Sequence, residues 1–333
     1  MDLITGGSGL LGQALARRLA EEGRAVRIFD LRKPDELPEG VEFTGGDIRD
    51  GVAVDRVVRG AVRIFHLAAL MHVGKIEPKV VREVNIGGLK NLMHAAERHR
   101  VRRIVFSSTI EIYGTSPPYP CYEDSPKNPP PGYATHKWES ENLLLDFQRE
   151  TGVEVSFTRM PMIFGAGFYH FKPILILFDL ILAGLPVPVL DGGAKEGKIV
   201  SLDDAVQGLI LCGEKEEAAG EAFNICCADV FTHRSLIEGL AQAVGSRSRV
   251  VSIPSALIKP GFELIFKLKF SPVAPEHFYF TLSDCVYDIS KASHLLGYKP
   301  EKTSVVAMVE TLQSYRRERW KFRKKKVANL LIH

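Results

Sequence analysis

Short apolar runs alternate with longer amphipathic stretches through the first half of the chain. The apolar runs predict strands over residues 2–5, 25–30, 41–46, 62–68, 102–108 and 153–160. The amphipathic stretches repeat apolar positions at helical spacing, and they predict helices over residues 10–22, 80–98 and 133–150. This alternation is typical of an α/β fold with a doubly wound parallel sheet. In such a sheet the carboxyl ends of the strands share one edge, where ligands bind.

The regular alternation ends after Gly165. The next apolar run is PILILFDLILAGLPVPVL, whose aspartate and internal prolines leave it short of the about 20 apolar residues of a membrane span. A helix is predicted from Leu202 and a strand over residues 221–227. We therefore expect a first domain over residues 1–165 and, over residues 166–315, mainly a smaller C-terminal substrate-binding subdomain, some of whose segments can rejoin the main sheet.

A glycine-rich sequence, TGGSGLLG, lies between the first strand and the first helix. Gly6, Gly9 and Gly12 are three residues apart, which permits a tight turn and a close backbone approach to a phosphate at the helix N-terminus. An ordinary turn uses glycines in the same way, so the motif alone is weak evidence. Its place after a strand and before a helix favours a Rossmann-type dinucleotide site, with Leu10 and Leu11 beside the cofactor.

The ends of the second and third strands suit the adenosine half of a dinucleotide. Asp30 closes the second strand, where a carboxylate accepts hydrogen bonds from a ribose diol and repels a 2′-phosphate. This favours NAD over NADP, although Arg32 and Lys33 lie close enough to neutralise a phosphate. Asp47 and Ile48 follow the third strand and suit an adenine amino group and ring face, but each is equally compatible with a turn or core role.

Small side chains follow the fourth strand in the sequence HLAAL. Ala68 and Ala69, directly after Leu67, leave room for a dinucleotide to approach the backbone. Four successive strand ends thus carry residues that fit one cofactor, and this joint order is the evidence for the site.

A tyrosine and a lysine stand four residues apart in the helix predicted over residues 133–150. Residues at this spacing share a helix face, so Lys137 lies beside Tyr133. A tyrosine with its ordinary pKa of about 10 is a poor base at neutral pH, and a neighbouring ammonium lowers that pKa. Thr109, at the end of the fifth strand, can donate a hydrogen bond to a substrate oxygen. The three residues predict acid–base catalysis of hydride transfer at an alcohol carbon.

The chain resembles the extended short-chain dehydrogenase/reductases, also described as the NAD-dependent epimerase/dehydratase group. The resemblance covers nearly the whole chain and rests on Asp30 and on the segments TGGSGLLG, GDI, HLAA, VNIGGLKNL, SSTIEIYG, YATHK, RMPMIFGAG, VSLDDAVQG and DISKASHLLGYKP. It implies a nicotinamide cofactor, Tyr133 and Lys137 as the catalytic pair, and Thr109 as their hydroxyl partner. In this family the lysine also bonds the nicotinamide ribose. The remaining candidate cofactor residues are Asn85, Ser107 and Met160.

The residues after Thr109 bear on the reaction type. Sugar-nucleotide 4,6-dehydratases resemble this segment but carry an Asp-Glu pair, whereas this chain has Ile110 and Glu111. An isoleucine cannot protonate a leaving hydroxyl, so dehydration is disfavoured and Glu111 remains as a single candidate acid or base.

A diphosphate clamp is missing from the two places where sugar-nucleotide epimerases carry arginines. The first place holds only Lys195 and Lys198, and the second, residues 277–291, has no cation before Lys291. This second segment and residues 255–270 are rich in large apolar side chains, which indicates either ordinary packing or a lining for a hydrophobic substrate. In this respect the chain is similar to the 3β-hydroxysteroid dehydrogenase-like branch.

Three functions stay open on the sequence. The first is an NAD-dependent dehydrogenase or reductase of a lipophilic secondary alcohol or ketone, such as a sterol. The second is a sugar-nucleotide epimerase of the nucleoside-diphosphate-sugar 4-epimerase type. The third is a nucleotide or redox sensor without catalysis, which the complete set of threonine, tyrosine and lysine argues against. By resemblance, we expect a homodimer that pairs through the helices near residues 80–98 and 133–150.

Charge is concentrated at the C-terminal end of this 333-residue chain. The net charge is +3, but residues 316–326 hold eight basic residues and one acidic one, so the rest is net acidic. A disordered tail over residues 316–333 is the plain interpretation, and contact with an anionic membrane surface is the alternative; we expect no nucleic-acid binding.

The five cysteines, Cys121, Cys212, Cys226, Cys227 and Cys285, form no Cys-x-x-Cys pair and no cluster with histidine. This pattern predicts neither a metal site nor a disulfide framework. The first predicted strand begins almost at Met1, which leaves no room for a signal peptide. We therefore expect a cytoplasmic protein.

Overall fold

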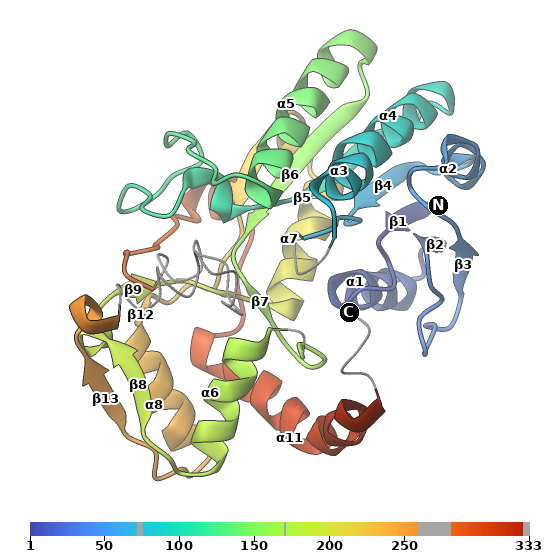
Figure 1. Ribbon diagram of the computed structural model, residues 1–333. Helices are drawn as coiled ribbons and strands as arrows, with labels where there is room; N and C mark the ends of the chain where they lie inside the picture. The colour runs from blue at the N-terminus through green and yellow to red at the C-terminus, as the bar shows by residue number, and fades with distance from the viewer. Residues whose placement is uncertain (72–75, 170, 259–280, 329–333) are drawn as a thin grey trace.

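A seven-stranded parallel sheet forms the centre of the molecule (Figure 1). The computed structural model describes residues 1–71, 76–169, 171–258 and 281–328, with side chains up to residue 319. The strand order is β11-β6-β5-β4-β1-β2-β3. The strands are β1 (Asp2–Thr5), β2 (Val26–Asp30), β3 (Val41–Gly45), β4 (Arg63–His66), β5 (Arg103–Thr109), β6 (Glu154–Met160) and β11 (Ala222–Asn224). The first six lie where the apolar runs predict strands.

Helices cover both faces of the sheet, as the doubly wound interpretation requires. One face is covered by α1 (Leu10–Glu21) and α7 (Leu202–Glu214), and the other by α2 (Gly51–Val58), α4 (Gly88–Arg98) and α5 (Tyr133–Thr151). Successive residues of one strand pack into opposite layers: Ile4 joins the core beneath α1 and α7, and Leu3 joins the core beneath α2 and α4. Both faces of the sheet are therefore buried, as in other parallel sheets.

The helix predicted over residues 80–98 is divided into three segments. It begins as α3 (Pro78–Arg82), widens into the π-helical segment η1 (Glu83–Gly87) and continues as α4. Short π-helical segments of this kind are frequent at functional sites.

Part of the second half returns to the main sheet. Strand β11 pairs with β6 in parallel, and α7 packs on the face that α1 covers. Residues 202–224 therefore belong structurally with the first 165 residues.

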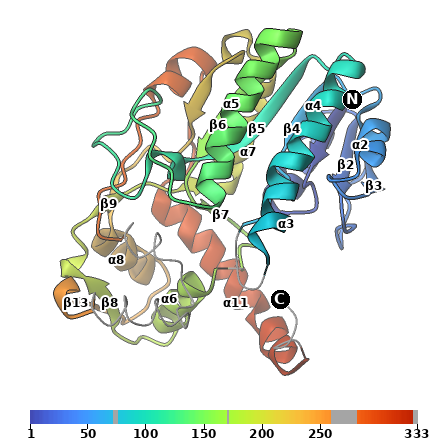
Figure 2. The same ribbon diagram turned by 45° about the horizontal axis from the view of Figure 1, so that its top comes forward.

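The rest of the second half forms a separate body at the carboxyl ends of the strands (Figure 2). Its helices are α6 (Lys172–Leu182), α8 (His233–Ala243) and α11 (Ser304–Ala328). Short strands pair within it: β8 (Val187–Leu190) with β13 (Val250–Ile253), β9 (Glu196–Gly197) with β12 (Phe231–Thr232), and β7 (Ile163–Phe164) with β10 (Val200–Ser201). The second body also contains the single turn η3 (Asp191–Gly193). The single turns η2 (Ile110–Tyr113), η4 (Glu216–Ala218) and η5 (Ala292–Leu296) lie with the main sheet: η2 follows β5, and η4 and η5 pack in the core beneath α1 and α7.

Helix α11 crosses the boundary that the charge pattern predicts at residue 316. Ala307, Met308 and Leu312 bury its first turns in the core of the second body, and the helix continues through residue 328. The segment 316–328 is thus helical where the charge run favoured a disordered tail, because it extends a helix already anchored by its apolar face. No helix within the described residues has the length and apolarity to cross a bilayer.

Candidate functional site

The glycine loop between β1 and α1 is packed too tightly for side chains. Gly6 has a φ of +69°, and a Cβ atom there would lie 2.6 Å from the backbone nitrogen of Ala68. A Cβ atom on Gly12 would lie 2.5 Å from the Cα atom of Gly7. Gly9 precedes the first turn of α1 and supplies no side-chain cap, so the amides of that turn stay available to an anion. The loop therefore fits the pyrophosphate of a dinucleotide.

Asp30 is tied directly to this loop. Its Oδ2 atom accepts a hydrogen bond from the backbone nitrogen of Ser8 at 3.0 Å, and the Ser8 hydroxyl donates to the carbonyl of Arg32 at 2.6 Å. A carboxylate held beside the phosphate cradle is well placed for a ribose diol and unfavourable for a further phosphate.

The two residues predicted at the adenine have different surroundings. Asp47 forms an ion pair with Arg49, with 2.5 Å between Oδ2 and Nη2, and this neighbour lowers the pKa of the carboxyl. Asp47 thus stays ionised and partly accessible as an acceptor. Ile48 is only 8% exposed and packs in the core against Gly88, so its main role is the core role that the sequence left open.

Asn85 organises the loop that contains Leu67, Ala68 and Ala69. It lies in η1, is buried, accepts from the backbone nitrogen of Leu70 at 2.7 Å and donates to the Leu70 carbonyl at 2.9 Å. These two bonds hold the loop after β4 in place beside the glycine loop.

The three candidate catalytic residues come together at the ends of β5 and α5. Gly132 adopts a φ of +104° just before Tyr133, which is the first residue of α5. One turn later, the Nζ atom of Lys137 donates to the Ser107 carbonyl at 2.6 Å and lies 5.5 Å from the centroid of the Tyr133 ring. Thr109 ends β5, and its Oγ1 atom accepts from the Glu111 nitrogen at 3.2 Å. Because that bond uses only an acceptor site, the threonine proton can still be donated to a substrate.

Met160 ends β6 directly opposite Thr109 in the strand register. Its side chain is buried in the core beneath α1 and α7, below the carboxyl ends of β5 and β6.

Comparison with known proteins agrees with this geometry. The model of the NAD dependent epimerase/dehydratase family matches residues 3–226. The chain belongs to this family.

Members with several different activities are similar to this family member. A 3-beta-hydroxysteroid dehydrogenase from Mycolicibacterium neoaurum is 30% identical over 350 residues, which cover 94% of this chain and 90% of that protein. A UDP-glucose 4-epimerase from Vibrio cholerae is 25% identical and covers 94% of both chains. The crystal structure of a double mutant of the dTDP-glucose 4,6-dehydratase DesIV from Streptomyces venezuelae, with NAD and DAU bound, matches with a TM-score of 0.76 and 26% identity, and the match covers 97% of this chain and 99% of that chain. The family, the fold and a nicotinamide cofactor are therefore shared, whereas the substrate differs among these relatives.

Burial dominates the electrostatics of the candidate catalytic pair, Tyr133 and Lys137. It lowers the pKa of Lys137 to about 7, against the opposing negative charge of Glu141. Burial also raises the pKa of Tyr133, and the negative charge of Glu111 adds to that effect. In this structure burial raises the tyrosine pKa where the sequence predicts a lowering by Lys137, because the Lys137 Nζ atom is directed to the Ser107 carbonyl and desolvation dominates.

Sequence reasoning missed His66 and Glu141. His66 ends β4, is fully buried and shares a 2.6 Å hydrogen bond between its Nδ1 atom and the Thr5 hydroxyl. Burial and the nearby Lys137 lower its pKa to about 3. Glu141 lies one helical turn beyond Lys137, a spacing that could have identified it.

The glycine loop yields a first prediction. Replacing Gly12 by Ala puts a methyl group against backbone that has no room for it, so we expect the affinity for NADH to fall at least tenfold in a fluorescence titration. Gly51→Ala is the matched control, because a Cβ atom there meets its nearest neighbour at 3.5 Å. Unchanged NADH affinity in Gly12→Ala, with native circular dichroism, would contradict the cradle.

His66 yields a second prediction. Its pKa is about 3 in the folded chain and about 6.5 when unfolded, so between these values the unfolded state binds more protons and stability falls as the pH falls. We expect wild type to lose about 2 kcal/mol more than His66→Asn between pH 6.5 and 5.0 in urea unfolding. Lys137 is largely protonated in both states over this window and cancels. Parallel pH dependences for the two proteins would refute the buried neutral imidazole.

Proposed function

We propose that this protein is an NAD-dependent dehydrogenase or reductase of a lipophilic secondary alcohol or ketone. The observation that supports this proposal most is that lysines which could contact a diphosphate form ion pairs within the chain. The Nζ atom of Lys195 is 2.8 Å from Asp284, and that of Lys291 is 2.7 Å from Glu221. Both lysines are already paired with carboxylates of this chain, which argues against their use as diphosphate ligands.

Each catalytic residue then has a defined task. Thr109 donates a hydrogen bond from its hydroxyl to the substrate oxygen and so holds that oxygen in place. Tyr133, as phenolate, takes the hydroxyl proton of the alcohol. Lys137, when charged, favours that phenolate. NAD⁺, held by the glycine loop and Asp30, would supply the two-electron hydride acceptor that oxidation of the alcohol to a ketone requires. The reverse transfer reduces the ketone.

Dehydration is disfavoured by the surroundings of residue 110. Ile110 is 7% exposed and packs with Ile112 and Tyr113 in an apolar cluster. Glu111 is the single carboxyl in the turn η2, so the paired acids that a 4,6-dehydratase uses have no counterpart there.

The apolar segment that suggests a hydrophobic lining falls largely on residues 259–280, outside the described residues. The proposal for a lipophilic substrate therefore rests on the charge pairing and not on a cavity. The epimerase alternative would take its phosphate contacts from backbone amides or from Lys198, which is half-buried and has no ion pair within the described part of the chain. The following experiment separates the two.

We would first denature the purified protein and quantify the NAD and NADH released per chain, and then assay NAD⁺ reduction with lipophilic secondary alcohols and with UDP- and dTDP-sugars. We expect little retained cofactor and turnover with an alcohol. Tyr133→Phe should lose at least about a thousandfold in kcat while its NADH affinity stays within threefold, because general acid–base catalysis is lost and binding is not. Near-stoichiometric cofactor together with turnover of a nucleotide sugar would overturn the proposal in favour of the epimerase.

Cofactor choice is tested separately. Because the Asp30 carboxylate is held at the glycine loop, we expect NADH to bind at least tenfold more tightly than NADPH. Asp30→Ser should reduce this ratio by weakening NADH binding and relieving charge repulsion, whereas Asp35→Ser, in the following loop, should leave it unchanged. Equal binding of both cofactors by wild type would refute the assignment.

A further inference from the structure

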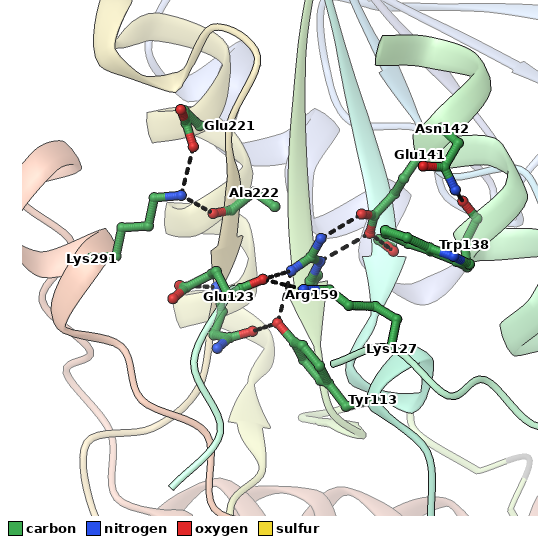
Figure 3. A network of polar contacts seen from close by, with 12 residues as sticks. Tyr113, Glu123, Lys127, Trp138, Glu141, Asn142, Arg159, Glu221, Ala222 and Lys291 are labelled. Atoms are coloured by element: carbon green, nitrogen blue, oxygen red, sulfur yellow. Dashed lines mark hydrogen bonds and ion pairs between the residues drawn. The ribbon is translucent and has the colours of Figure 1, made fainter. Parts of the chain in front are cut away.

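A buried ion pair lies directly behind the catalytic residues (Figure 3). Arg159, next to the end of β6, is 4% exposed, and Glu141 on α5 is 1% exposed. The Nε and Nη2 atoms of Arg159 donate to the two carboxylate oxygens of Glu141 at 3.1 and 2.7 Å. This bidentate geometry is the most directional form of an ion pair between side chains.

The pair connects α5 to β5 beside the catalytic residues. Glu141 also accepts a hydrogen bond from the Ser108 hydroxyl at 2.5 Å. Ser108 precedes Thr109, and Glu141 follows Lys137 by one turn. Lys137 donates to the Ser107 carbonyl, and Glu141 accepts from Ser108. Two successive turns of α5 are therefore bonded to two successive residues of β5.

The third nitrogen of the Arg159 guanidinium group forms hydrogen bonds with the segment between Thr109 and Tyr133. Its Nη1 atom donates to the Tyr113 hydroxyl at 2.9 Å and to the Glu123 carbonyl at 2.7 Å. Lys127 donates to the same Glu123 carbonyl at 2.6 Å. Figure 3 shows Arg159 at the centre of these contacts, between Glu141 on one side and Tyr113 and Glu123 on the other.

The network extends to the edge of the sheet. The Tyr113 hydroxyl donates to the Oδ1 atom of Asn224 on β11 at 2.8 Å, and the backbone nitrogen of Asn224 donates to the Glu123 carboxylate at 2.8 Å. Every described segment that carries Thr109, Tyr133 or Lys137 is thus bonded, directly or through one residue, to Arg159.

We propose that Glu141 and Arg159 are positioning residues, whose ion pair fixes α5 and the segment between Thr109 and Tyr133 in register against β5. Stability alone does not explain such a pair, because apolar side chains of similar volume often replace a buried ion pair at no cost in stability. An apolar replacement of the pair removes directional hydrogen bonds. Ser108 loses its bond to Glu141, and Tyr113 and the Glu123 carbonyl lose their bonds to Arg159. The catalytic readout rests on the proposed function, and the exchange readout below does not.

The test compares two double variants. Glu141→Leu with Arg159→Met removes the pair behind the site. Arg103→Met with Glu154→Leu removes a second ion pair, between a buried arginine and a half-buried glutamate, at the opposite ends of β5 and β6. There the Nε atom of Arg103 lies 2.8 Å from Glu154, and Nη1 donates to the carbonyls of Cys212 and Lys215. Both are arginine–glutamate pairs whose arginine lies on a central strand of the main sheet, and only the first adjoins the candidate catalytic residues.

We would measure Tm, NADH affinity, kcat and KM on the proposed alcohol substrate, and amide hydrogen exchange by mass spectrometry. For the first variant we expect at least a tenfold loss of kcat, with KM and NADH affinity within threefold of wild type. We also expect at least tenfold faster exchange in peptides over residues 107–113 and 133–141. The control variant should change neither kcat nor exchange in these peptides. Ser108→Ala, which cuts only the link from Glu141 to β5, should show a smaller loss of kcat of the same kind and secures the test if the double variant fails to fold.

Unchanged exchange over residues 107–113 and 133–141 would overturn the positioning role whatever the activity. So would faster exchange with normal kcat, or equal losses of kcat in the two double variants at equal Tm. A wild type that turns over no lipophilic alcohol would refute the proposed function, while the exchange comparison would still decide the positioning role.

Discussion

The docking of helix α5 on strand β5 is the contact on which the candidate site depends. Tyr133 and Lys137 belong to the helix and Thr109 to the strand, so their relative placement is set by how the two elements meet. Two polar bonds define that meeting: one from Lys137 to the Ser107 carbonyl and one from Ser108 to Glu141. Hydrophobic packing would allow the helix to slide, whereas two directional bonds in successive turns allow one register. The rest of the fold supplies the rigid sheet against which this register is defined.

The same burial that fixes the helix also sets the charge of its residues. Lys137 has a pKa of about 7, so a small electrostatic change decides whether it is charged at neutral pH. Glu141 is the charged neighbour that opposes this desolvation, and Arg159 holds Glu141 in place. His66 lies nearby but stays neutral, because its own burial lowers its pKa to about 3. The position and the charge of Lys137 therefore both depend on Glu141.

The sequence predicted those features that arise from local pattern. Alternating runs located the six strands from β1 to β6, and helical spacing placed Tyr133 and Lys137 on one face. Features that depend on partners far along the chain were not predictable. Arg159 is 18 residues from Glu141 and 46 from Tyr113, and nothing in the sequence joins them. The lowering of the Tyr133 pKa was wrong for a similar reason, since helical spacing shows that two residues are neighbours but not where an ammonium points or how deeply it is buried.

The question of the substrate depends on such a long-range partner as well. On the sequence alone, Lys195 stays open as a phosphate contact for the epimerase alternative, although the arginine clamp is missing. In the structure Lys195 forms an ion pair with Asp284, which is 89 residues away in the chain. Asp284 also accepts a hydrogen bond from the backbone nitrogen of Glu196. A diphosphate would have to displace a carboxylate that is already bound on two sides, while a neutral ligand would leave the pair intact. A charged residue in a sequence thus indicates the charge of a ligand only when its partners within the protein are known. Here the ion pair between Lys195 and Asp284 favours an uncharged substrate.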